Sequence, residues 1–379
     1  MTEYRFAAAQ DWLKVIDFID LVFSQSAGPH DFADLIPKVY GDGHDYSHIH
    51  AIALEDGDIR GCVAVLPYDM DLAGKKLRVG YLGSVSVHRL SRGAGHMKKL
   101  MQMQIDKAKA EGIDMMVLGG QRQRYGYFGF HPVGGAYGYS ISQANVRHAL
   151  GNVDASAFTF EKLTQGADSD YAHALYQKQI VCGSRPAENF AEIACSFNSQ
   201  GWLVKQNGTN AGYLIANREQ NGIHEIVLED PALIPAVLKA WMAAYSVHHL
   251  RISAAPYNKT LNRMLAAFAE GYSIGQADYM LCLNYANTIR SWMTLKNAVV
   301  PLSEGCVRLG IAGEVLELKV ADGAISVEKT DALADVSLTA AEADQLLFAY
   351  NRFYAPEVGC AIPADWFPLP LYISRADMF

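Results

Sequence analysis

The chain has 379 residues, of which 50% are hydrophobic and 19% charged, so we expect an ordinary globular protein long enough for two or three domains. Its formal net charge of −8 argues against a nucleic-acid partner and favours cationic small molecules. The sequence has no apolar run approaching the ~18 residues of a membrane span, no apolar signal region at its start and no C-x-x-C pair among its six cysteines, so we expect reduced thiols and a cytoplasmic location.

The first 50 residues predict a helix and then a polar loop. Apolar residues recur at helical spacing over 11–23, which indicates an amphipathic helix. Residues 24–50 are polar and carry several aspartates and histidines. His44 and His48 have the spacing of two metal ligands on a helix face, but the glycines just before them argue against a rigid helix. We therefore expect a solvated loop here and no metal site.

Two β-hairpins should follow. Residues 51–66 contain two apolar strands around the turn signal Asp56-Gly57-Asp58. A second extended pair spans 68–87 and turns at Ala73-Gly74. Its last strand ends with Val85-Ser86-Val87, directly before a glycine-bearing segment.

That segment, Arg92-Gly93-Ala94-Gly95-His96-Met97-Lys98, predicts an anion site. Its two glycines permit a tight turn with bare N–H groups, and the helix that starts there directs its positive end at the same place. The helix is amphipathic and ends near Gly112, and a buried parallel strand at 114–118 closes on Gly119-Gly120. The spacing fits neither a P-loop nor a dinucleotide fingerprint, because position 98 is lysine.

The turn resembles the R/Q-x-x-G-x-G/A loop of the GNAT N-acetyltransferases, with Met97 where that pattern has Gly or Ala. Downstream, Tyr125-Gly126-Tyr127-Phe128-Gly129-Phe130 resembles the Y-x-x-x-G-F segment of the same family, at the expected distance. The resemblance implies that the first unit uses acetyl-CoA.

Residues 149–283 read as a faint repeat of the first unit. A hairpin around Asn207-Gly208 is followed by a strand at 224–228, a helix at 233–245 and a strand at 250–253. Glu229-Asp230-Pro231-Ala232 takes the place of the glycine turn, and acids with a proline cannot cradle a phosphate. We expect a GNAT-like unit without a cofactor site; the alternative is an unrelated α/β domain.

Residues 284–379 should form a third unit. It has a hairpin around Asp322-Gly323, a strand at 336–338, and a capping box, Thr339 to Glu342, that opens a helix. This pattern resembles a sterol-carrier-protein-like domain. The tail stays apolar to its last residue, Phe379, so we expect it to be tied down.

The whole chain resembles the Eis-type N-acetyltransferases. The implied fold is α/β (α+β), with two tandem GNAT-like mixed-sheet units at 1–148 and 149–283 and a sterol-carrier-like α+β domain at 284–379. The implied activity is acetyl transfer from acetyl-CoA, without a metal, to an amine of an aminoglycoside- or polyamine-like molecule or to a lysine side chain of a peptide. A homo-oligomer, often a hexamer, is implied as well.

The resemblance also assigns roles to residues. Tyr125 would be the general acid, and the C-terminal carboxylate of Phe379 the general base. The acetyl-CoA site would comprise Val85, Ser86, Val87, Arg92, Gly93, Ala94, Gly95, His96, Met97, Lys98, Gly120 and Gln121. Two alternatives stay open: a lipid- or ligand-binding carrier in which the first unit is a relic, and a CoA sensor without turnover. The sequence does not name the acceptor amine.

Overall fold

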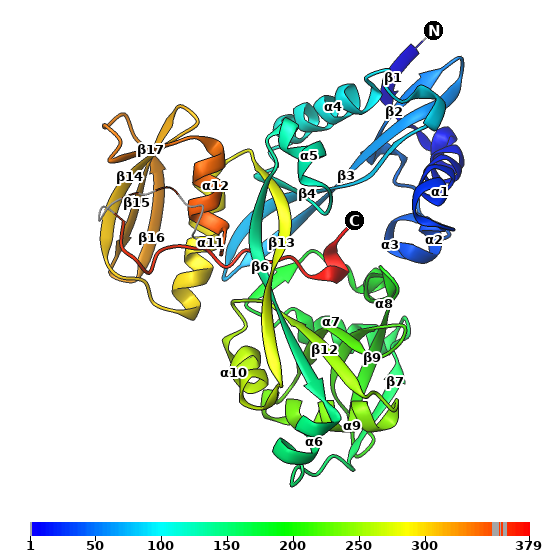
Figure 1. The fold of residues 1–379 in the computed structure, drawn as a ribbon, viewed down its shortest axis with the longest axis vertical. Coiled ribbons are helices and arrows are strands. Elements are labelled where there is room, and N and C mark those ends of the chain that lie inside the picture. The colour runs from blue at the N-terminus through cyan, green and yellow to red at the C-terminus, as the bar shows by residue number, and fades with distance from the viewer. Residues whose placement is uncertain (1, 351–355, 357, 359–361) are drawn as a thin grey trace.

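In a computed structural model, which describes residues 2–350, 356, 358 and 362–379, the chain forms three lobes (Figure 1). A thirteen-stranded mixed sheet runs through the first two lobes, in the order β1-β2-β3-β4-β5-β13-β6-β12-β11-β10-β9-β7, with β8 added to β3. A separate four-stranded sheet builds the third lobe. The predicted mixed α/β class is confirmed. Within the described ranges, no helix is long and apolar enough to cross a membrane.

Antiparallel hairpins open the first lobe. Both predicted turns are confirmed, at Asp56-Gly57 and at Ala73-Gly74, and their residues have the positive φ angles that two-residue hairpin turns require. The predicted helix is also confirmed as α1 (Trp12–Ala27), which covers one face of the sheet. The strands are β1 (Thr2–Phe6), β2 (His50–Glu55), β3 (Asp58–Leu72) and β4 (Lys75–Val87), and the short helices before β2 are α2 (Phe32–Leu35) and α3 (Pro37–Tyr40).

The expected strand, glycine turn, helix and parallel strand follow. α4 (His96–Ala110) covers the face opposite α1 and buries Leu100 and Met101 completely. It ends as predicted, because Gly112 has a φ of 70° and the Ile113 N–H returns to the Ala108 carbonyl at 2.9 Å. β5 (Met115–Leu118) then lies parallel to β4.

Two long strands, β6 (His131–Ser142) and β13 (Gly271–Cys282), join the first two lobes (Figure 1). They pair with each other along most of their length. The end of β13 also pairs with β5, Tyr279 opposite Leu118, so a strand from the end of the second unit completes the sheet of the first. The boundaries at 148 and 283 stay predictions, and the sheet is continuous across the first of them.

The second lobe repeats the arrangement of the first. β9 (Ser199–Gln206) and β10 (Thr209–Asn217) form the predicted hairpin. β11 (Gly222–Leu228), α9 (Ile234–Ala244) and β12 (His249–Ala254) then form a parallel strand–helix–strand unit, as expected. Elements without a sequence prediction complete the lobe: α6 (Gln143–Ala149), β7 (Phe158–Lys162), α7 (Ala167–Tyr176), α8 (Phe190–Cys195) and α10 (Lys259–Phe268). The short strand β8 (Val181–Gly183), also without a prediction, pairs with β3 of the first lobe.

The third lobe packs two helices against its sheet. The predicted hairpin at Asp322-Gly323 is confirmed, and so is the capping box, in which the Thr339 N–H donates to Glu342 at 2.8 Å. The sterol-carrier likeness stays a prediction. The elements are α11 (Tyr285–Val299), β14 (Gly305–Ile311), β15 (Glu314–Ala321), β16 (Ala324–Lys329), β17 (Val336–Leu338) and α12 (Ala340–Phe348).

The C-terminal tail runs from the third lobe past β6 and β13 to the junction of the first two lobes (Figure 1). Trp366, Leu369 and Leu371 are fully buried along this path, and Phe379 is only 6% exposed. The expectation that the chain end is tied down is therefore confirmed.

Candidate active site

A gap opens between β4 and β5 beside the glycine turn. The two strands pair only from Val79 to Tyr81, after which β4 continues to Val87 and β5 stops at Leu118. A β-bulge sits at the gap, where the β3–β4 register shifts and Ser84 has a φ of 52°. Beyond Tyr81, the edge of β4 that faces the gap therefore has room to pair with an extended ligand, and the assignment of Val85 and Val87 to this role stays a prediction.

The glycine turn lies at the end of β4. Gly93 and Gly95 have φ values of 87° and 85°, and a Cβ on either would meet no atom within 4 Å. Backbone conformation, not crowding, therefore calls for glycine at both positions. Gly95 is the N-cap of α4, and no side chain in the described part of the chain caps that end. The first N–H groups of a 15-residue helix are thus free for an anion.

The His96 side chain does not face this anion site. It is 2% exposed, lies 2.9 Å from the Tyr4 hydroxyl and 3.0 Å from a Glu55 carboxylate oxygen. Glu55 also accepts a hydrogen bond from Ser91 at 2.8 Å, so the network fastens the turn to β2. His96 can therefore serve an anion only through its backbone N–H.

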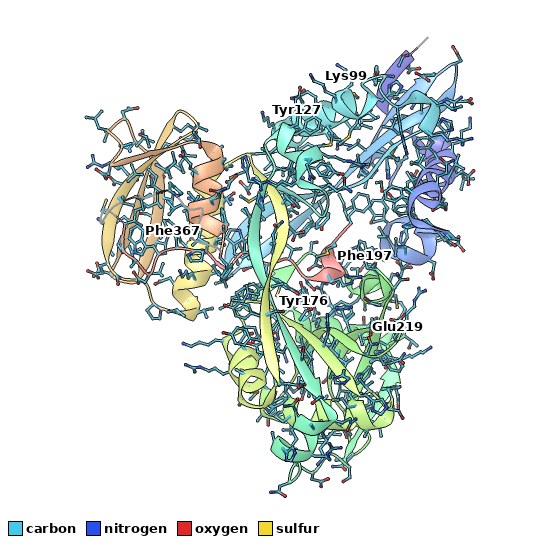
Figure 2. All side chains as sticks on the ribbon, in the orientation of Figure 1. Lys99, Tyr127, Tyr176, Phe197, Glu219 and Phe367 are labelled. Carbon is cyan, nitrogen blue, oxygen red and sulfur yellow. The ribbon has the colours of Figure 1, made fainter. Side chains whose placement is uncertain are left out.

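A cavity of about 880 Å³ extends from Gly95 between α4, the aromatic turn and the third lobe. Its α4 wall is basic, with Lys98, Lys99 and Lys109. The Lys98 ammonium lies 5.2 Å from the centre of the Tyr127 ring, which is a cation–π distance. Figure 2 shows Lys99 on α4 and Tyr127 on the neighbouring turn. The cavity thus offers positive charge and an aromatic face beside the glycine turn, while Arg92 is exposed at the turn itself.

Tyr125 stands on the β5 side of the gap, at the end of the short helix α5 (Arg122–Tyr125). Its ring packs beneath Gly120, where a Cβ would come within 2.5 Å of it, and it meets Phe130 edge-on at 6.4 Å. Its hydroxyl makes no hydrogen bond with any described residue, and burial raises its pKa above the ordinary 10.0. A tyrosine in this state keeps its proton at neutral pH and can donate it.

The carboxyl group of Phe379 stands on the β4 side of the gap. A Cβ placed on Gly83 would come within 2.8 Å of a terminal oxygen and 3.0 Å of the carboxyl carbon. The ring is stacked on Tyr40 at 6.0 Å and meets His50 edge-on at 6.4 Å. The last residue is therefore anchored by its ring, with its carboxyl group over β4 just before the bulge.

The two groups approach the gap from opposite faces of the sheet. Tyr125 belongs to the core cluster beneath α4, with Leu100 and Met101. Phe379 belongs to the cluster on the α1 face, with Tyr81. A substrate threaded between β4 and β5 could therefore meet a proton donor on one side and a carboxylate on the other.

Sequence reasoning missed a buried acid next to the gap. Asp278 on β13 is 1% exposed, accepts a hydrogen bond from Tyr81 at 3.1 Å, and has a second carboxyl oxygen with no partner among the described residues. Burial raises its pKa to about 7. The available signal was a single acid directly before the apolar run 279–282, since a buried acid is costly unless it is neutral or paired.

The polar segment 24–50 uses its acids and histidines in structural contacts. Asp34 binds Arg218 of the second lobe at 2.7 Å, and His44 pairs with Glu192 at 2.8 Å. Within residues 2–350, 356, 358 and 362–379, no three or more acidic, histidine or cysteine side chains gather as metal ligands.

Comparison with known proteins agrees with this geometry. Residues 3–133 match the family model of the acetyltransferase (GNAT) domain. The first lobe, with its glycine turn and open gap, is therefore a GNAT acetyltransferase domain, the domain of an acyl-transferring enzyme. No curated protein resembles the chain significantly in sequence.

Solved structures resemble the chain over nearly its full length. A GCN5-related N-acetyltransferase from Kribbella flavida matches with a TM-score of 0.66 and 14% identity, covering 91% of this chain and 88% of its own. One from Anabaena variabilis matches with a TM-score of 0.65 and 14% identity, covering 91% and 89%. Eis1 from Mycobacterium abscessus matches with a TM-score of 0.66 and 11% identity, covering all of both chains. At these identities the likeness is one of fold, and it includes the arrangement of all three lobes.

Proposed function

We propose that the chain is an acetyl-CoA-dependent N-acetyltransferase whose acceptor is an amine of a cationic small molecule or of a lysine side chain. The observation that carries the proposal is the gap between β4 and β5, with an uncapped helix end at its mouth and Tyr125 and the Phe379 carboxyl group on its two sides. The resemblance to Eis-type enzymes supports the same roles.

The residues fit an acetyl-CoA substrate. The turn from Arg92 to Lys98 would hold the pyrophosphate with N–H groups and positive charge. The backbone of Val85 and Val87, with Gly120 and Gln121 across the gap, would line the pantetheine chain. The basic cavity beside Gly95 would take the nucleotide end.

In the reaction, the amine attacks the thioester carbonyl, and the carbon–sulfur bond then breaks. The Phe379 carboxylate accepts the proton that the ammonium must lose, since an amine of pKa ~10 is protonated at neutral pH. The Tyr125 hydroxyl donates a proton to the departing sulfur. The net charge of −8 favours a cationic acceptor.

The experiment is thiol release from acetyl-CoA with a panel of aminoglycosides, polyamines and lysine peptides. Amine-dependent release supports the proposal. Acetyl-CoA binding by calorimetry without release from any amine would support the CoA sensor instead. If the protein neither binds acetyl-CoA nor releases thiol, and retains a lipid or another ligand, a function as a ligand-binding carrier is favoured. The same panel read by mass spectrometry identifies the acceptor.

The role of the chain end has its own test. Appending one glycine after Phe379 moves the carboxylate by up to ~3.6 Å and leaves the Phe379 ring in place. We expect turnover to fall ~10²–10⁴-fold, the usual share of a general base, with acetyl-CoA affinity kept. Intact mass should first establish the last residue of both proteins. Parental turnover in the extended chain would remove the carboxylate from the mechanism.

We also propose a homo-oligomer. The first half of β13 is an exposed strand, with Tyr272 68% and Ile274 48% exposed. Large exposed apolar side chains along a strand are typical of a subunit contact. Light scattering would measure the mass in solution, and Ile274→Lys should lower it.

A further inference from the structure

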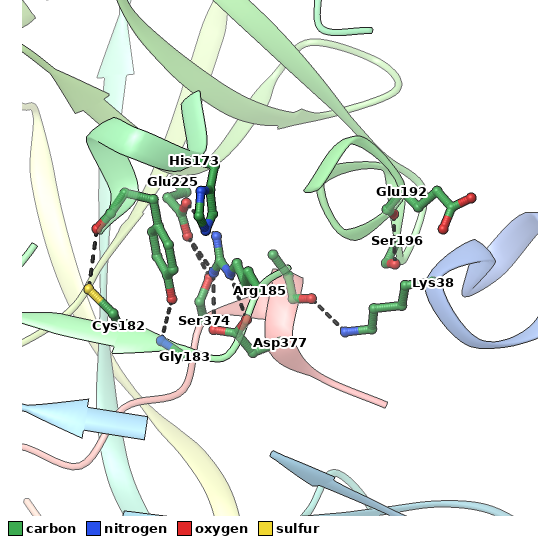
Figure 3. Close-up of polar contacts among 12 residues, drawn as sticks. Lys38, His173, Cys182, Gly183, Arg185, Glu192, Ser196, Glu225, Ser374 and Asp377 are labelled. Carbon is green, nitrogen blue, oxygen red and sulfur yellow. Dashed lines mark hydrogen bonds and ion pairs between the residues drawn. The ribbon is translucent and has the colours of Figure 1, made fainter. Parts of the chain in front are cut away.

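Three charged side chains meet at the junction of the first two lobes and the tail (Figure 3). Arg185 is 2% exposed and lies between the carboxylates of Glu225 and Asp377. None of the three belongs to the acetyl-CoA site described above. A buried guanidinium between two acids is costly to desolvate, so its placement calls for a reason.

The contacts are bidentate on both sides. Arg185 donates to the two oxygens of Glu225 at 2.8 and 2.9 Å, and to the two oxygens of Asp377 at 2.7 and 3.0 Å. Glu225 also accepts hydrogen bonds from Tyr213 at 2.7 Å and from Ser374 at 2.8 Å. Burial alone would raise the pKa of Glu225, but the Arg185 charge and these hydrogen bonds bring it below its ordinary value. The pair is therefore ionised at neutral pH and rigid in direction.

The gap of the second lobe contains the cluster formed by Arg185, Glu225 and Asp377. β11 and β12 pair only at Gly222 and Ile223, and Glu225 follows two residues after the last pair. Gly83 stands at the same place in the first lobe, two residues after Tyr81. A cavity of about 340 Å³ lies here, lined in part by Arg185 and Glu225. The gap of the second lobe has no glycine turn beside it, and the Arg185 guanidinium lies there instead.

The Arg185 guanidinium binds the tail at Asp377, two residues before the last residue, Phe379. Lys38 adds a hydrogen bond to the Ala376 carbonyl at 2.6 Å, and Arg375 donates to the Phe197 carbonyl at 3.2 Å. Two residues span at most ~7 Å, so the position of Asp377 limits where the Phe379 carboxyl group can lie. Figure 3 shows Arg185, Asp377 and Lys38 gathered around this last stretch of the tail.

We infer that Arg185 is a positioning residue for acyl transfer: through its clamp on Asp377 it fixes the carboxyl group of Phe379 over Gly83. The inference rests on the proposed role of that carboxylate as the base. It gives the second lobe a task in a reaction that takes place in the first. Placement within about half an ångström is what a catalytic group requires, so we expect the clamp to be needed in addition to the ring contacts with Tyr40 and His50.

The test is Asp377→Asn. This variant removes the charge on the tail and leaves Arg185 bound to Glu225, so no unpaired charge is buried. We expect kcat to fall ~10–10²-fold, with the calorimetric affinity for acetyl-CoA unchanged and KM for the amine changed little. The matched control is Asp11→Asn, which weakens another bidentate arginine pair, to Arg5 at 2.6 and 3.0 Å, that includes no residue of the tail. Its kcat should equal that of the parent.

A double-mutant cycle with the glycine extension after Phe379 separates positioning from plain stability. If Asp377 acts only through the terminal carboxylate, Asp377→Asn should cost nothing more in the extended chain, whose residual rate is measured at raised enzyme concentration. If the kcat losses of Asp377→Asn and of the glycine extension multiply in the double variant, the inference is wrong. It is also wrong if Asp377→Asn alone keeps the parental kcat. Should Asp377→Asn fail to fold, Ser374→Ala enters the same cycle with the same two outcomes.

The cycle also distinguishes this inference from the proposed function. Full activity of the extended chain would refute the carboxylate as base, and the positioning role with it. An inactive extended chain beside a fully active Asp377→Asn would refute the positioning role alone.

Discussion

The carboxyl group of Phe379 lies so close to Gly83 that a single methyl group would not fit between them. A Cβ on Gly83 would come within 2.8 Å of a terminal oxygen, whereas real Cβ atoms almost never come within 3.0 Å of a neighbour. Phe379 ends the tail of the third unit and Gly83 lies in the first, so the candidate site is assembled from the two ends of the fold.

The first prediction concerns this contact. Gly83→Ala should displace the terminal carboxyl group and lower kcat ~10²-fold or more, while acetyl-CoA binding, measured by calorimetry, is retained. The matched control is Gly271→Ala, also in a strand, where a Cβ meets nothing within 4 Å. Equal rates in the two variants would show that the carboxyl group can shift without consequence.

The second prediction concerns the proton donor. Tyr125→Phe keeps the ring against Gly120 and Phe130 and removes only a hydroxyl that bonds to no described residue. We expect unchanged acetyl-CoA affinity and an unchanged Tm, with kcat lowered ~10²–10⁴-fold. A variant within twofold of the parental rate would exclude Tyr125 as the general acid.

The third prediction concerns the number of acetyl-CoA sites. Calorimetry should find one site per chain, because the second lobe has Asp230 and Pro231 where the first has its glycine turn. Gly95→Glu should abolish binding by placing bulk and negative charge at the phosphates. Gly208→Glu carries the same backbone strain, at a φ of 81° in the hairpin of the second lobe, and should bind normally. Two sites, or full affinity in Gly95→Glu, would contradict the assignment.

The fourth prediction follows from the buried acid. The pKa of Asp278 is raised to about 7 by burial, so the unfolded chain loses this proton at a lower pH than the folded chain does. Stability should therefore fall as the pH rises from about 4 to about 7 and level off above it. Relative to the parent, Asp278→Asn should gain up to about 4 kcal/mol in unfolding free energy at pH 8 and much less at pH 4, since one pKa unit is about 1.4 kcal/mol.

Chemical denaturation of both proteins at the two pH values measures this difference directly. All other titrating groups are common to parent and variant and cancel. A constant difference between the proteins across the range would show that Asp278 does not titrate there.

The features that could be predicted from the sequence are those determined by residues close together in the chain. The turns at Asn207-Gly208 and Asp322-Gly323, the Thr339 to Glu342 capping box, and the glycine turn before α4 each depend on a few neighbouring residues, and the structure confirms them. The repeat of strand, helix and parallel strand in the second lobe was visible for the same reason.

Long-range contacts could not be predicted in this way. The insertion of β13 between β5 and β6 joins segments that share no pattern, and the clamp of Arg185 on Glu225 and Asp377 draws on three separate parts of the chain. Asp278 carried a faint signal, but its pairing with Tyr81 depends on which strands become neighbours. The roles of the site residues were expected from family resemblance, and the experiments above decide them.

The insertion of β13 also determines when the first lobe can mature. Until Tyr279 has been synthesised and paired with Leu118, the edge of β5 has no partner, and the apolar strand that should be central is open to other chains. A nascent chain stopped anywhere before that strand is therefore an aggregation-prone intermediate, and contacts so distant along the chain form slowly. While residues 119–279 of the 379 are being added, the sheet therefore stays unfinished at its centre.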